Sequence, residues 1–469
     1  MSQNIRMLER EPKIRKHDFE QISFGYSKEE MLIEARRCLQ CKKPMCCVGC
    51  PVEVDIPKFI KFLSDDKPQE AIKILRENNS LPAVCGRVCP QETQCEKFCI
   101  LYKQNASICI GNLERYAADS TSKIHNSFFN ISSIKKNGLK IAVVGSGPAG
   151  LTCGGDLLRM GYDVTIYESL HDSGGVLRYG IPEFRLPKKI LDIEINILKK
   201  SGMKINLNTF IGRTKTIRDL FNEGYKSIFI AVGAGLPIFP NIPGENLNHV
   251  YSASEFLVRI NLMHAYDFPI YDTPVYKGKN VVVIGGGNTA MDSARTSIRL
   301  GAKTVKLIYR RTEDEMPSRK EEKKHAKEEG VEFIVLTSPV RFIGDVKRFV
   351  KAVECVKMES NGHSNFGVKN SLKKIDGSNH IIETDMVILA LGLHPNPVLS
   401  SLTNNLNIDT RGYLIVDNNY MTSIPGIFAG GDIVGGSTVI EAIGMGKKAA
   451  KAIVEYIKKT NRYMQKTKF

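Results

Sequence analysis

A glycine-rich turn that follows a short apolar strand constrains this chain more than any other stretch. Residues 140–150 read KIAVVGSGPAG, in which a buried-strand pattern leads into three glycines and a helix pattern follows. Glycines let the backbone approach phosphate groups, and the first turn of a helix presents free N–H groups and a partial positive charge. We therefore predict a dinucleotide diphosphate site here rather than an ordinary loop. It is predicted to comprise Gly145, Gly147, Pro148, Ala149 and Gly150.

An acidic residue ends the next predicted strand. The strand pattern covers residues 163–167, and Glu168 follows it, 23 residues after Gly145. A carboxylate in this position suits the two ribose hydroxyls of an adenosine that carries no 2′-phosphate. Strand, glycine turn, helix and carboxylate are thus in register for a dinucleotide-binding unit.

Twelve cysteines dominate the composition, and ten of them lie between Cys38 and Cys109. The 469 residues are enough for about three domains. No apolar run is long enough to span a membrane, and the charged N-terminal residues do not resemble a secretory signal. We therefore expect a cytoplasmic protein with no membrane contact. Disulfides are rare in that compartment, so the clustered cysteines indicate a metal site.

The net charge of +16 comes mostly from scattered lysines. Such a distribution is typical of a solvated basic surface, and no basic run interleaved with aromatic residues indicates nucleic acid. We expect no nucleic-acid partner, and a partner steered by this charge would be acidic.

The cysteines fall into two groups, and each contains a Cys-Pro pair. The first, C-x2-C-x4-C-x3-C-P, starts at Cys38 after a helix that Ser27 and Glu30 are predicted to cap, and the second, C-x3-C-P-x4-C-x3-C, starts at Cys85. Structural zinc prefers paired C-x2-C knuckles, which the second group lacks, and free buried thiols are improbable at this density. Because Cys-Pro is typical of ferredoxin runs, we predict iron–sulfur clusters rather than zinc.

Three segments around these cysteines resemble a known family. RCLQCKKPMCCVGCP (37–51), LPAVCGRVCPQETQCEKFC (81–99) and IGNLERY (110–116) are similar to the N-terminal domain of the glutamate synthase small-subunit family. Related modules occur in dihydropyrimidine dehydrogenase and in the large subunit of bifurcating ferredoxin:NADP reductases. The resemblance extends over nearly the whole chain, and it implies two [4Fe–4S] clusters with interleaved ligands.

The resemblance, carried over residue by residue, implies one ligand set for each cluster. The first cluster takes Cys38, Cys41, Cys46 and Cys99, and the second takes Cys50, Cys89, Cys95 and Glu114. Cys47 competes with its neighbour Cys46, and the spacing favours Cys46. Cys85 and Cys109 are the alternatives to Glu114, and are otherwise expected to be packing thiols.

Two further stretches are expected to contact the flavin. In the resembled family, the segment GGVLRYGIP, which starts at residue 174, lies along the flavin. Residues 426–432 read GIFAGGD, a strand and a tight turn, and a helix rich in small residues is predicted over 438–452. The FAD contacts beyond the first glycine turn are predicted at Glu168, Gly175, Val176, Leu177, Gly233, Gly431, Asp432, Thr438 and Val439.

A second glycine fingerprint begins 140 residues after the first, in VVVIGGGNTA (281–290). The strand that follows it ends in two arginines instead of a carboxylate, and guanidinium groups bind a 2′-phosphate, which a carboxylate would repel. The sequence therefore favours NADP(H) over NAD(H). The contacts are predicted at Gly285, Gly287, Asn288, Thr289, Ala290, Arg310 and Arg311. The densely charged stretch 320–329 is predicted to be a solvated helix face.

These patterns predict an α/β fold with two Rossmann-type domains of the glutathione-reductase kind, preceded by an α-helical iron–sulfur domain. The predicted division is a helical domain over 1–138, an FAD domain over 139–270 and 394–469, and an NADP(H) domain over 271–393. The same fold hosts disulfide reductases, but neither nucleotide domain contains C-x2-C or C-x4-C. A disulfide reductase is therefore not expected.

The resemblance implies an NADPH-dependent oxidoreductase of the glutamate synthase (NADPH) small-subunit type, which supports glutamate biosynthesis. FAD would accept a hydride from NADPH and pass single electrons through the two clusters to a partner. We expect no protein nucleophile and no acid–base pair, since the cofactors carry the chemistry. The alternative is the large subunit of an electron-bifurcating NADH-dependent reduced ferredoxin:NADP oxidoreductase, or a protein like sulfide dehydrogenase.

A second redox subunit is expected in either case. Glutamine hydrolysis needs an activated nucleophile, which in that family is typically an N-terminal cysteine of the large subunit, and this chain begins Met1-Ser2-Gln3. The partner is expected to be the glutamate synthase large subunit or a small flavoprotein subunit, the latter together with ferredoxin.

Overall fold

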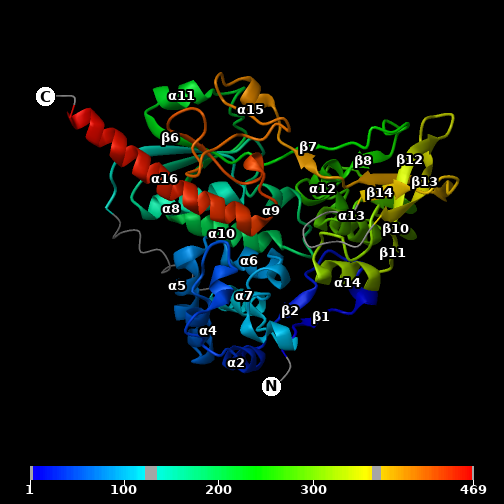
Figure 1. Cartoon of the computed structure of the whole chain (residues 1–469), viewed down its shortest axis with the longest axis horizontal. Helices are drawn as coiled ribbons and strands as arrows, with labels where there is room; N and C mark the ends of the chain where they lie inside the picture. The colour runs from blue at the N-terminus through cyan, green and yellow to red at the C-terminus, as the bar shows by residue number, and fades with distance from the viewer. Residues whose placement is uncertain (1–3, 122–134, 362–370, 467–469) are drawn as a thin grey trace.

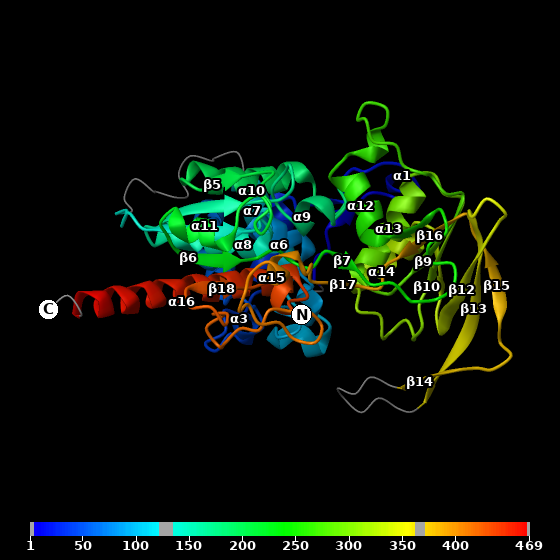
Figure 2. The same ribbon diagram turned by 90° about the horizontal axis from the view of Figure 1, so that it is seen from above.

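Two five-stranded parallel sheets organise the chain, and a bundle of helices lies beside the first of them (Figures 1 and 2). The computed structural model describes residues 4–121, 135–361 and 371–466. This arrangement confirms the predicted α/β fold, in which a helical N-terminal part precedes two Rossmann-type sheets along the chain. Among the described residues, no helix is both long and apolar enough to cross a bilayer.

The first sheet has the strand order β18-β6-β3-β4-β5. Its strands are β3 (Lys140–Val144), β4 (Asp163–Tyr167), β5 (Lys204–Asn206), β6 (Tyr225–Ile230) and β18 (Ile427–Ala429). Successive residues of β3 point to opposite faces, so Ile141 and Val143 pack with helices α8 (Pro148–Arg159) and α16 (Val439–Lys466). Ala142 and Val144 pack on the other face, with α11 (Ile217–Asn222). The buried strand predicted from the sequence is thus confirmed.

The second sheet has the order β11-β10-β9-β16-β8. Its strands are β8 (Val250–Ser252), β9 (Asn280–Ile284), β10 (Thr304–Ile308), β11 (Val331–Ile334) and β16 (Met386–Leu389). Helices α12 (Ala253–Asn261) and α13 (Asn288–Arg299) cover one face. The antiparallel strands β12 (Thr337–Gly344), β13 (Val350–Asn361), β14 (Ser371–Lys374) and β15 (His380–Glu383) form a separate sheet, part of which packs on the other face.

The domain boundary predicted at residue 270 is wrong for residues 250–261. Strand β8 pairs with β16 of the second sheet, and α12 follows it directly. No local pattern indicates this pairing, because β8 is three residues long and precedes the second fingerprint by about thirty residues. The chain passes between the two sheets at a short antiparallel pair, β7 (Leu236–Pro237) with β17 (Leu393–His394).

Short helices form the N-terminal bundle. They are α2 (Lys28–Arg36), α3 (Met45–Val48), α4 (Ile56–Ser64), α5 (Pro68–Asn78), α6 (Pro82–Val88) and α7 (Ile110–Thr121). The predicted capping box is confirmed, since the Ser27 hydroxyl accepts from the Glu30 N–H and the Glu30 carboxylate accepts from the Ser27 N–H. The apolar core of the bundle is continuous with the α8–α16 face of the first sheet.

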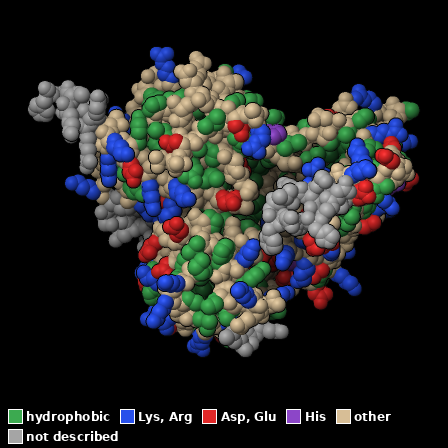
Figure 3. Space-filling view, viewed as in Figure 1, with side chains coloured by type: hydrophobic (Ala, Val, Ile, Leu, Met, Phe, Trp, Pro, Cys, Tyr) green, Lys and Arg blue, Asp and Glu red, His purple; other side chains and the backbone are tan. Residues whose placement is uncertain are grey.

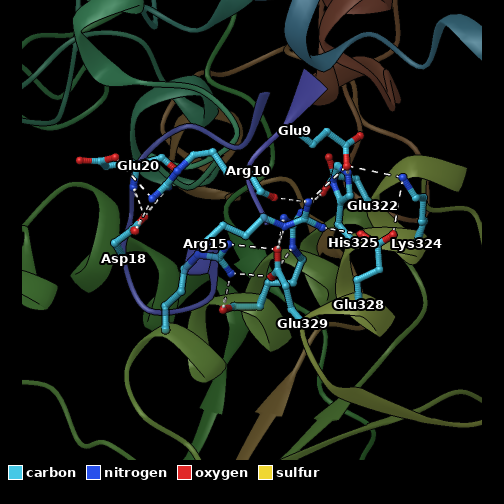
Figure 4. Close-up of polar contacts among 12 residues, drawn as sticks. Glu9, Arg10, Arg15, Asp18, Glu20, Glu322, Lys324, His325, Glu328 and Glu329 are labelled. Carbon is cyan, nitrogen blue, oxygen red and sulfur yellow. Dashed lines mark hydrogen bonds and ion pairs between the residues drawn. The ribbon is translucent and has the colours of Figure 1, made fainter. Parts of the chain in front are cut away.

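The charged helix α14 (Lys320–Glu328) is solvated on one side only, where Glu321, Lys324 and Lys327 are exposed, so the predicted solvated face is wrong for the other side. Glu322, His325 and Glu329 are buried against the N-terminal segment, which contains β1 (Leu8–Glu9), α1 (Pro12–Arg15) and β2 (Ser23–Gly25). Figure 4 shows this junction, in which Arg15 points from α1 toward α14. The Arg15 guanidinium contacts Glu329 at 3.0 Å, Glu328 at 2.6 Å and Glu9 at 3.2 Å. The helix carries its buried carboxylates opposite arginines from elsewhere in the chain, which a local charge pattern does not reveal.

Glu329 is the centre of this junction, and its side chain is completely buried. It accepts from Arg295 at 2.9 Å and from Arg299 at 2.6 Å, both on α13, in addition to Arg15. Burial alone would raise its pKa, but the guanidinium groups of Arg295 and Arg299 hold the pKa well below its usual range. The carboxylate therefore stays ionised and joins two helices of the second sheet to the N-terminus.

Arg185, which lies between α9 (Val176–Tyr179) and β5 of the first sheet, links the part of the chain around the first sheet to helices α13 and α14. Arg185 forms a bidentate pair with Asp292 of α13, at 2.6 and 2.8 Å, and its Nε lies 2.9 Å from Glu322 of α14. The ring of the preceding residue, Phe184, lies under the Arg299 guanidinium at 3.9 Å. The second sheet is thus attached to the rest of the molecule largely by buried ion pairs.

Basic side chains elsewhere are scattered, as the sequence predicted. On the face shown in Figure 3, Lys and Arg side chains are spread over all parts of the molecule and are interspersed with acidic ones.

Replacing Glu329 by Gln should destabilise the protein strongly, because it leaves buried guanidinium groups without their counter-charge. Loss of one partner of a buried pair costs about 3–5 kcal/mol. Urea unfolding followed by circular dichroism should show this loss for Glu329→Gln. The matched control Glu313→Gln removes an exposed pair with Lys327 and should change the free energy of unfolding by less than about 1 kcal/mol. Equal effects of the two changes would contradict the central role of Glu329.

Candidate cofactor sites

The first glycine turn has a backbone path that only glycine permits. Gly145 follows β3 with φ +104°, and a Cβ there would lie 2.3 Å from the carbonyl oxygen of Ala231. A Cβ on Gly150 would lie 2.0 Å from the carbonyl oxygen of Gly145. Gly147 caps helix α8, which begins at Pro148, and there a Cβ would meet open space. The turn therefore presents bare backbone at the N-terminus of α8, as a diphosphate requires.

Glu168 directly follows β4 and is buried. Its Oε2 accepts from the N–H of Ser146 at 2.9 Å and from the Ser146 hydroxyl at 2.5 Å. Its Oε1 accepts from the N–H of Leu170 at 2.9 Å. The carboxylate is thus fixed against the glycine turn, in the position from which an adenosine ribose would be held.

The other predicted flavin contacts converge on the same turn. Gly175 has φ +55°, and a Cβ there would lie 2.7 Å from the Cα of Gly147. Gly431 has φ +82°, and a Cβ there would lie 3.1 Å from the Cβ of Ala149. Burial raises the pKa of the neighbouring Asp432 to about 6, with a contribution from Glu441. Two segments about 250 residues apart thus meet at one helix N-terminus.

The remaining predicted contacts lie at element boundaries around this turn. Val176 and Leu177 begin the short helix α9 (Val176–Tyr179), Gly233 has φ +69° beyond the end of β6, and Val439 begins α16. The Glu441 carboxylate accepts from the N–H of Thr438, which fixes the first turn of α16.

Helix α16 touches both the flavin turn and the cysteine region. A Cβ on Gly446 would lie 2.3 Å from the carbonyl oxygen of Ala149. Two residues earlier, and so on the opposite side of the helix, a Cβ on Gly444 would lie 2.9 Å from the carbonyl oxygen of Pro51, which follows Cys50. Ile440 of the same helix lines the cavity formed by the second cysteine set. The two predicted sites are therefore separated by a single helix.

The second set of cysteines surrounds this cavity. Cys50, Cys89 and Cys95 line it, and so do Glu114 and Cys85. Burial raises the pKa of Cys50 to about 11, and the Cys85 thiol, hydrogen-bonded to Cys89, is among the causes that raise the pKa of Cys89. The structure therefore brings together three predicted thiolate ligands with both Glu114 and one of its two rivals.

Glu114 has a distinctive environment in this cavity. Its Oε1 accepts from Asn79 Nδ2 at 2.8 Å, and the Asn79 Oδ1 lies 3.6 Å from the Cys85 sulfur. Withdrawal from bulk water raises the Glu114 pKa to about 8, and no described Lys or Arg forms an ion pair with it. A carboxylate without a cation beside three thiols is a donor set that fits an iron cluster. Sequence reasoning missed Asn79, because no local motif connects it to residue 114.

Cys109, the other rival, lies elsewhere. Its N–H donates to Glu34 at 2.8 Å, and its thiol interacts with the Tyr26 hydroxyl. Burial raises its pKa, with Glu96 and Glu34 adding to the effect. It is not among the residues that line the cavity.

The first set of cysteines lies closer to the surface. Burial raises the pKa of Cys38, and the nearby thiols of Cys41 and Cys99 add to this. A hydrogen bond to Cys47 raises the pKa of Cys46, with Cys99 and Cys38 also contributing. These four predicted ligands are thus neighbours in space, and Cys47 lies beside them, so the choice between Cys46 and Cys47 stays a prediction. Four thiols in one place fit a [4Fe–4S] cluster.

The second glycine turn repeats the geometry of the first. Gly285 has φ +144°, and a Cβ there would lie 2.3 Å from the carbonyl oxygen of Ala390. Gly287 caps α13, whose first turn contains Asn288, Thr289 and Ala290. The two sheets thus each present a helix N-terminus with bare backbone to a dinucleotide.

The two arginines after β10 differ in their contacts. Arg311 pairs with Glu315 at 3.1 Å and is largely buried, whereas Arg310 is exposed. The end of β10 carries no carboxylate that would repel a 2′-phosphate, because residues 309–311 are Tyr-Arg-Arg. The geometry suits a 2′-phosphate between a paired guanidinium and an exposed one.

Arg319 connects the second glycine turn to the cysteine region, which the sequence did not suggest. Its N–H donates to Asn288 Oδ1 at 3.0 Å, and its Nη2 donates to Gln91 Oε1 at 3.1 Å. Gln91 in turn lines the second cysteine cavity. The predicted nucleotide site and the predicted cluster site thus share one buried arginine.

Comparison with known proteins agrees with this division of the chain. The family model of dihydropyrimidine dehydrogenase domain II, a 4Fe-4S cluster domain, matches residues 15–126. The pyridine nucleotide-disulphide oxidoreductase family model matches residues 139–450, about two thirds of the chain.

Curated relatives match along nearly the whole chain. The chain is 37% identical to the glutamate synthase [NADPH] small chain of Escherichia coli over 453 residues, which is 95% of both chains. It is 35% identical to the same small chain of Azospirillum brasilense, over 95% of this chain and 92% of that one. Among solved structures, FprA from Mycobacterium tuberculosis in complex with NADPH has a TM-score of 0.58 at 19% identity, covering 70% of this chain and 86% of that one. That likeness concerns the fold of the two sheets.

The Arg310 and Arg311 side chains should determine nucleotide choice. Replacing both with Gln should raise the KM for NADPH at least tenfold and leave that for NADH almost unchanged, because only NADPH has a 2′-phosphate to lose. Steady-state reduction of an artificial dye with each nucleotide measures this. Equal losses for the two nucleotides would show that the arginines support the fold or a phosphate common to both.

Glu114 should be the fourth ligand of the second cluster. Glu114→Ala should alter one of the two cluster signals in electron paramagnetic resonance spectra of the reduced protein, because a ligand oxygen is lost. Cys85→Ala and Cys109→Ala should leave both signals intact. An unchanged spectrum for Glu114→Ala, together with cluster loss in Cys85→Ala, would assign the ligand to Cys85 instead.

Proposed function

This chain belongs to the glutamate synthase small-chain family of iron–sulfur flavoproteins, and we propose that it delivers electrons from NADPH to a large chain that makes glutamate. It is an NADPH-dependent oxidoreductase that uses FAD and [4Fe–4S] clusters. When bound, FAD takes a hydride from NADPH and the clusters accept one electron at a time. The observation that supports the proposal best is the position of α16, which contacts both the flavin turn and the second cysteine cavity.

The chain's own residues hold and orient these groups. The N-termini of α8 and α13 bind the diphosphates of FAD and NADPH, and Glu168 and the Arg310–Arg311 pair distinguish the two adenosines. Asp432, beside the α16 N-terminus, supplies a hydrogen-bonding group to the flavin side of the site. Arg185 holds the nucleotide sheet against the flavin domain through Asp292, and Arg15 joins the nucleotide sheet to the N-terminal segment through Glu329.

The spatial order of the two cysteine sets, one nearer the flavin turn than the other, suits electron transfer away from the flavin. We propose that the second set, with Cys50, Cys89, Cys95 and Glu114, holds the cluster near α16, since Ile440 and Pro51 lie between it and the flavin turn. The first set, with Cys38, Cys41, Cys46 and Cys99, would hold the outer cluster. Cys50 belongs to the first group in the sequence but to the second cluster, and Cys99 belongs to the second group but to the first cluster. The ligands of the two clusters are therefore interleaved.

The family relatives are small chains, which supports a large partner chain as the final site of chemistry. We propose that this chain supplies two dinucleotide sites and two cysteine sets, and that amide hydrolysis and glutamate formation belong to the partner.

Anaerobically purified protein should contain one FAD and about eight irons, the number required by two four-iron clusters. It should reduce artificial one-electron dyes with NADPH on its own. Glutamine and 2-oxoglutarate should yield glutamate only after addition of the large chain encoded in the same genome. Zinc in place of iron would contradict the cluster assignment, and glutamate formation by the isolated chain would contradict the need for a partner.

A further inference from the structure

The cysteines of the two sets differ in their exposure. In the second set Cys89 and Cys95 are buried and Cys50 is partly exposed, whereas all four cysteines of the first set, Cys38, Cys41, Cys46 and Cys99, are partly exposed. Electron transfer between proteins requires a centre close to the surface, so the first set is the place where electrons can leave the chain.

Six large apolar side chains are exposed around the first set. They are Leu39, Met45, Val48, Phe98, Ile100 and Tyr102. The most exposed are Val48, with 71% of its surface accessible, and Ile100, with 65%. Five of the six are sequence neighbours of a cysteine, so they lie on the two loops that carry the first set. The loops are in contact, since a Cβ on Gly49 would lie 2.5 Å from the Phe98 ring. Exposed apolar side chains that gather in one place indicate an interaction site.

The same two loops are strongly basic. Arg36, Lys42, Lys43, Lys97 and Lys103 are exposed, and none of them forms an ion pair with any residue that the structure describes. Residues 36–52 and 97–113 contain no Asp or Glu. Acidic groups near these stretches come from outside them: Asp55 lies near Cys47, Glu34 pairs with Arg37 at 2.6 Å, and Glu96 is turned inward, where it accepts from the Gly111 N–H. The charge on this face is therefore positive and not neutralised within the chain.

We propose that these two loops form the docking surface for an acidic electron-accepting protein. The surface comprises residues 36–48 and 97–103. We call it the exit surface. The inference rests on the proposed function, because it names the place where the partner binds. The six apolar side chains supply the area that excludes water, and the five cations select a partner with a negative face around its own redox centre.

The exit surface accounts for the unbalanced charge and the exposed apolar groups together. Exposed apolar residues in the middle of a polar rim are typical of protein interfaces. Positive charge without local acidic partners steers an anionic partner and raises its rate of association. Each NADPH that is oxidised yields NADP⁺, one proton and two electrons. The exit surface must therefore either bind two one-electron acceptors in turn or pass two electrons in succession to one bound partner.

The first test uses small acceptors of opposite charge and needs no partner. Lys42→Glu/Lys43→Glu should lower kcat/KM for ferricyanide at least fivefold at low ionic strength and raise it for hexaammineruthenium(III). Both effects should shrink at 0.5 M salt, because exposed charges are screened. The matched control is Lys458→Glu/Lys459→Glu on the exposed part of α16, which should change neither rate by more than about 1.5-fold. Equal behaviour of the two double variants would overturn the proposal.

The second test measures binding to the large chain encoded in the same genome, by biolayer interferometry with the iron content of every variant measured. Lys42→Glu/Lys43→Glu should weaken the affinity at least tenfold, and so should Val48→Glu, with wild-type iron content. Wild-type affinity in both variants would overturn the proposal. If Val48→Glu loses iron, the lysine variant decides, because its side chains are exposed.

The two tests separate this inference from the proposed function. If wild-type protein does not bind the large chain but the small acceptors discriminate as described, the exit surface stands and the choice of partner is wrong. If the large chain binds wild-type protein and all variants equally, the partner is right and the exit surface is wrong.

Discussion

Close backbone contact on two sides of helix α16 is the constraint on which the arrangement of the sites depends. Gly446 lets the helix touch Ala149 at the flavin turn, and Gly444 lets it touch Pro51 beside Cys50. A side chain at either position would meet a carbonyl oxygen, so the helix would have to move away from one neighbour. Because both contacts are made at backbone distance, the flavin turn and the second cysteine cavity are held as close as one helix permits.

The two sheets are attached to their surroundings by different forces. The helical bundle shares one apolar core with the first sheet, and such an interface resists relative movement. The second sheet is instead connected chiefly by the buried ion pairs Arg185–Asp292 and Arg15–Glu329, and by Arg319, which hydrogen-bonds to Gln91. Ion pairs are directional, so they fix the orientation of the nucleotide site against the flavin site more than they add stability. The apolar core keeps the distance between the flavin site and the cysteine sets fixed, and the ion pairs fix the orientation of the nucleotide site. This arrangement suits a transfer from nucleotide to flavin followed by a transfer from flavin to clusters.

Local patterns predicted the parts of the fold that depend on local rules. The strand at 163–167 and the Ser27–Glu30 capping box follow from periodicity and cap chemistry, and both are confirmed. The structure also brings the predicted residue Gly175 to Gly147. What failed depends on distant contacts: helix α14 reads as a solvated face, but its carboxylates meet arginines more than 300 residues earlier and 30 residues away. Asn79 is likewise invisible in the sequence, because only folding brings it to Glu114.

The residues that line the cavity of the second cysteine set are synthesised at very different times. Its thiols come from residues 50–95, near the beginning of the chain, but one wall is Ile440 on the last helix. Roughly 390 residues separate Cys50 from that wall, so the cysteines leave the ribosome long before the cavity can close. The wall of the cavity that faces the flavin turn is therefore the last to be made, and the cavity is complete only when the C-terminal helix is in place.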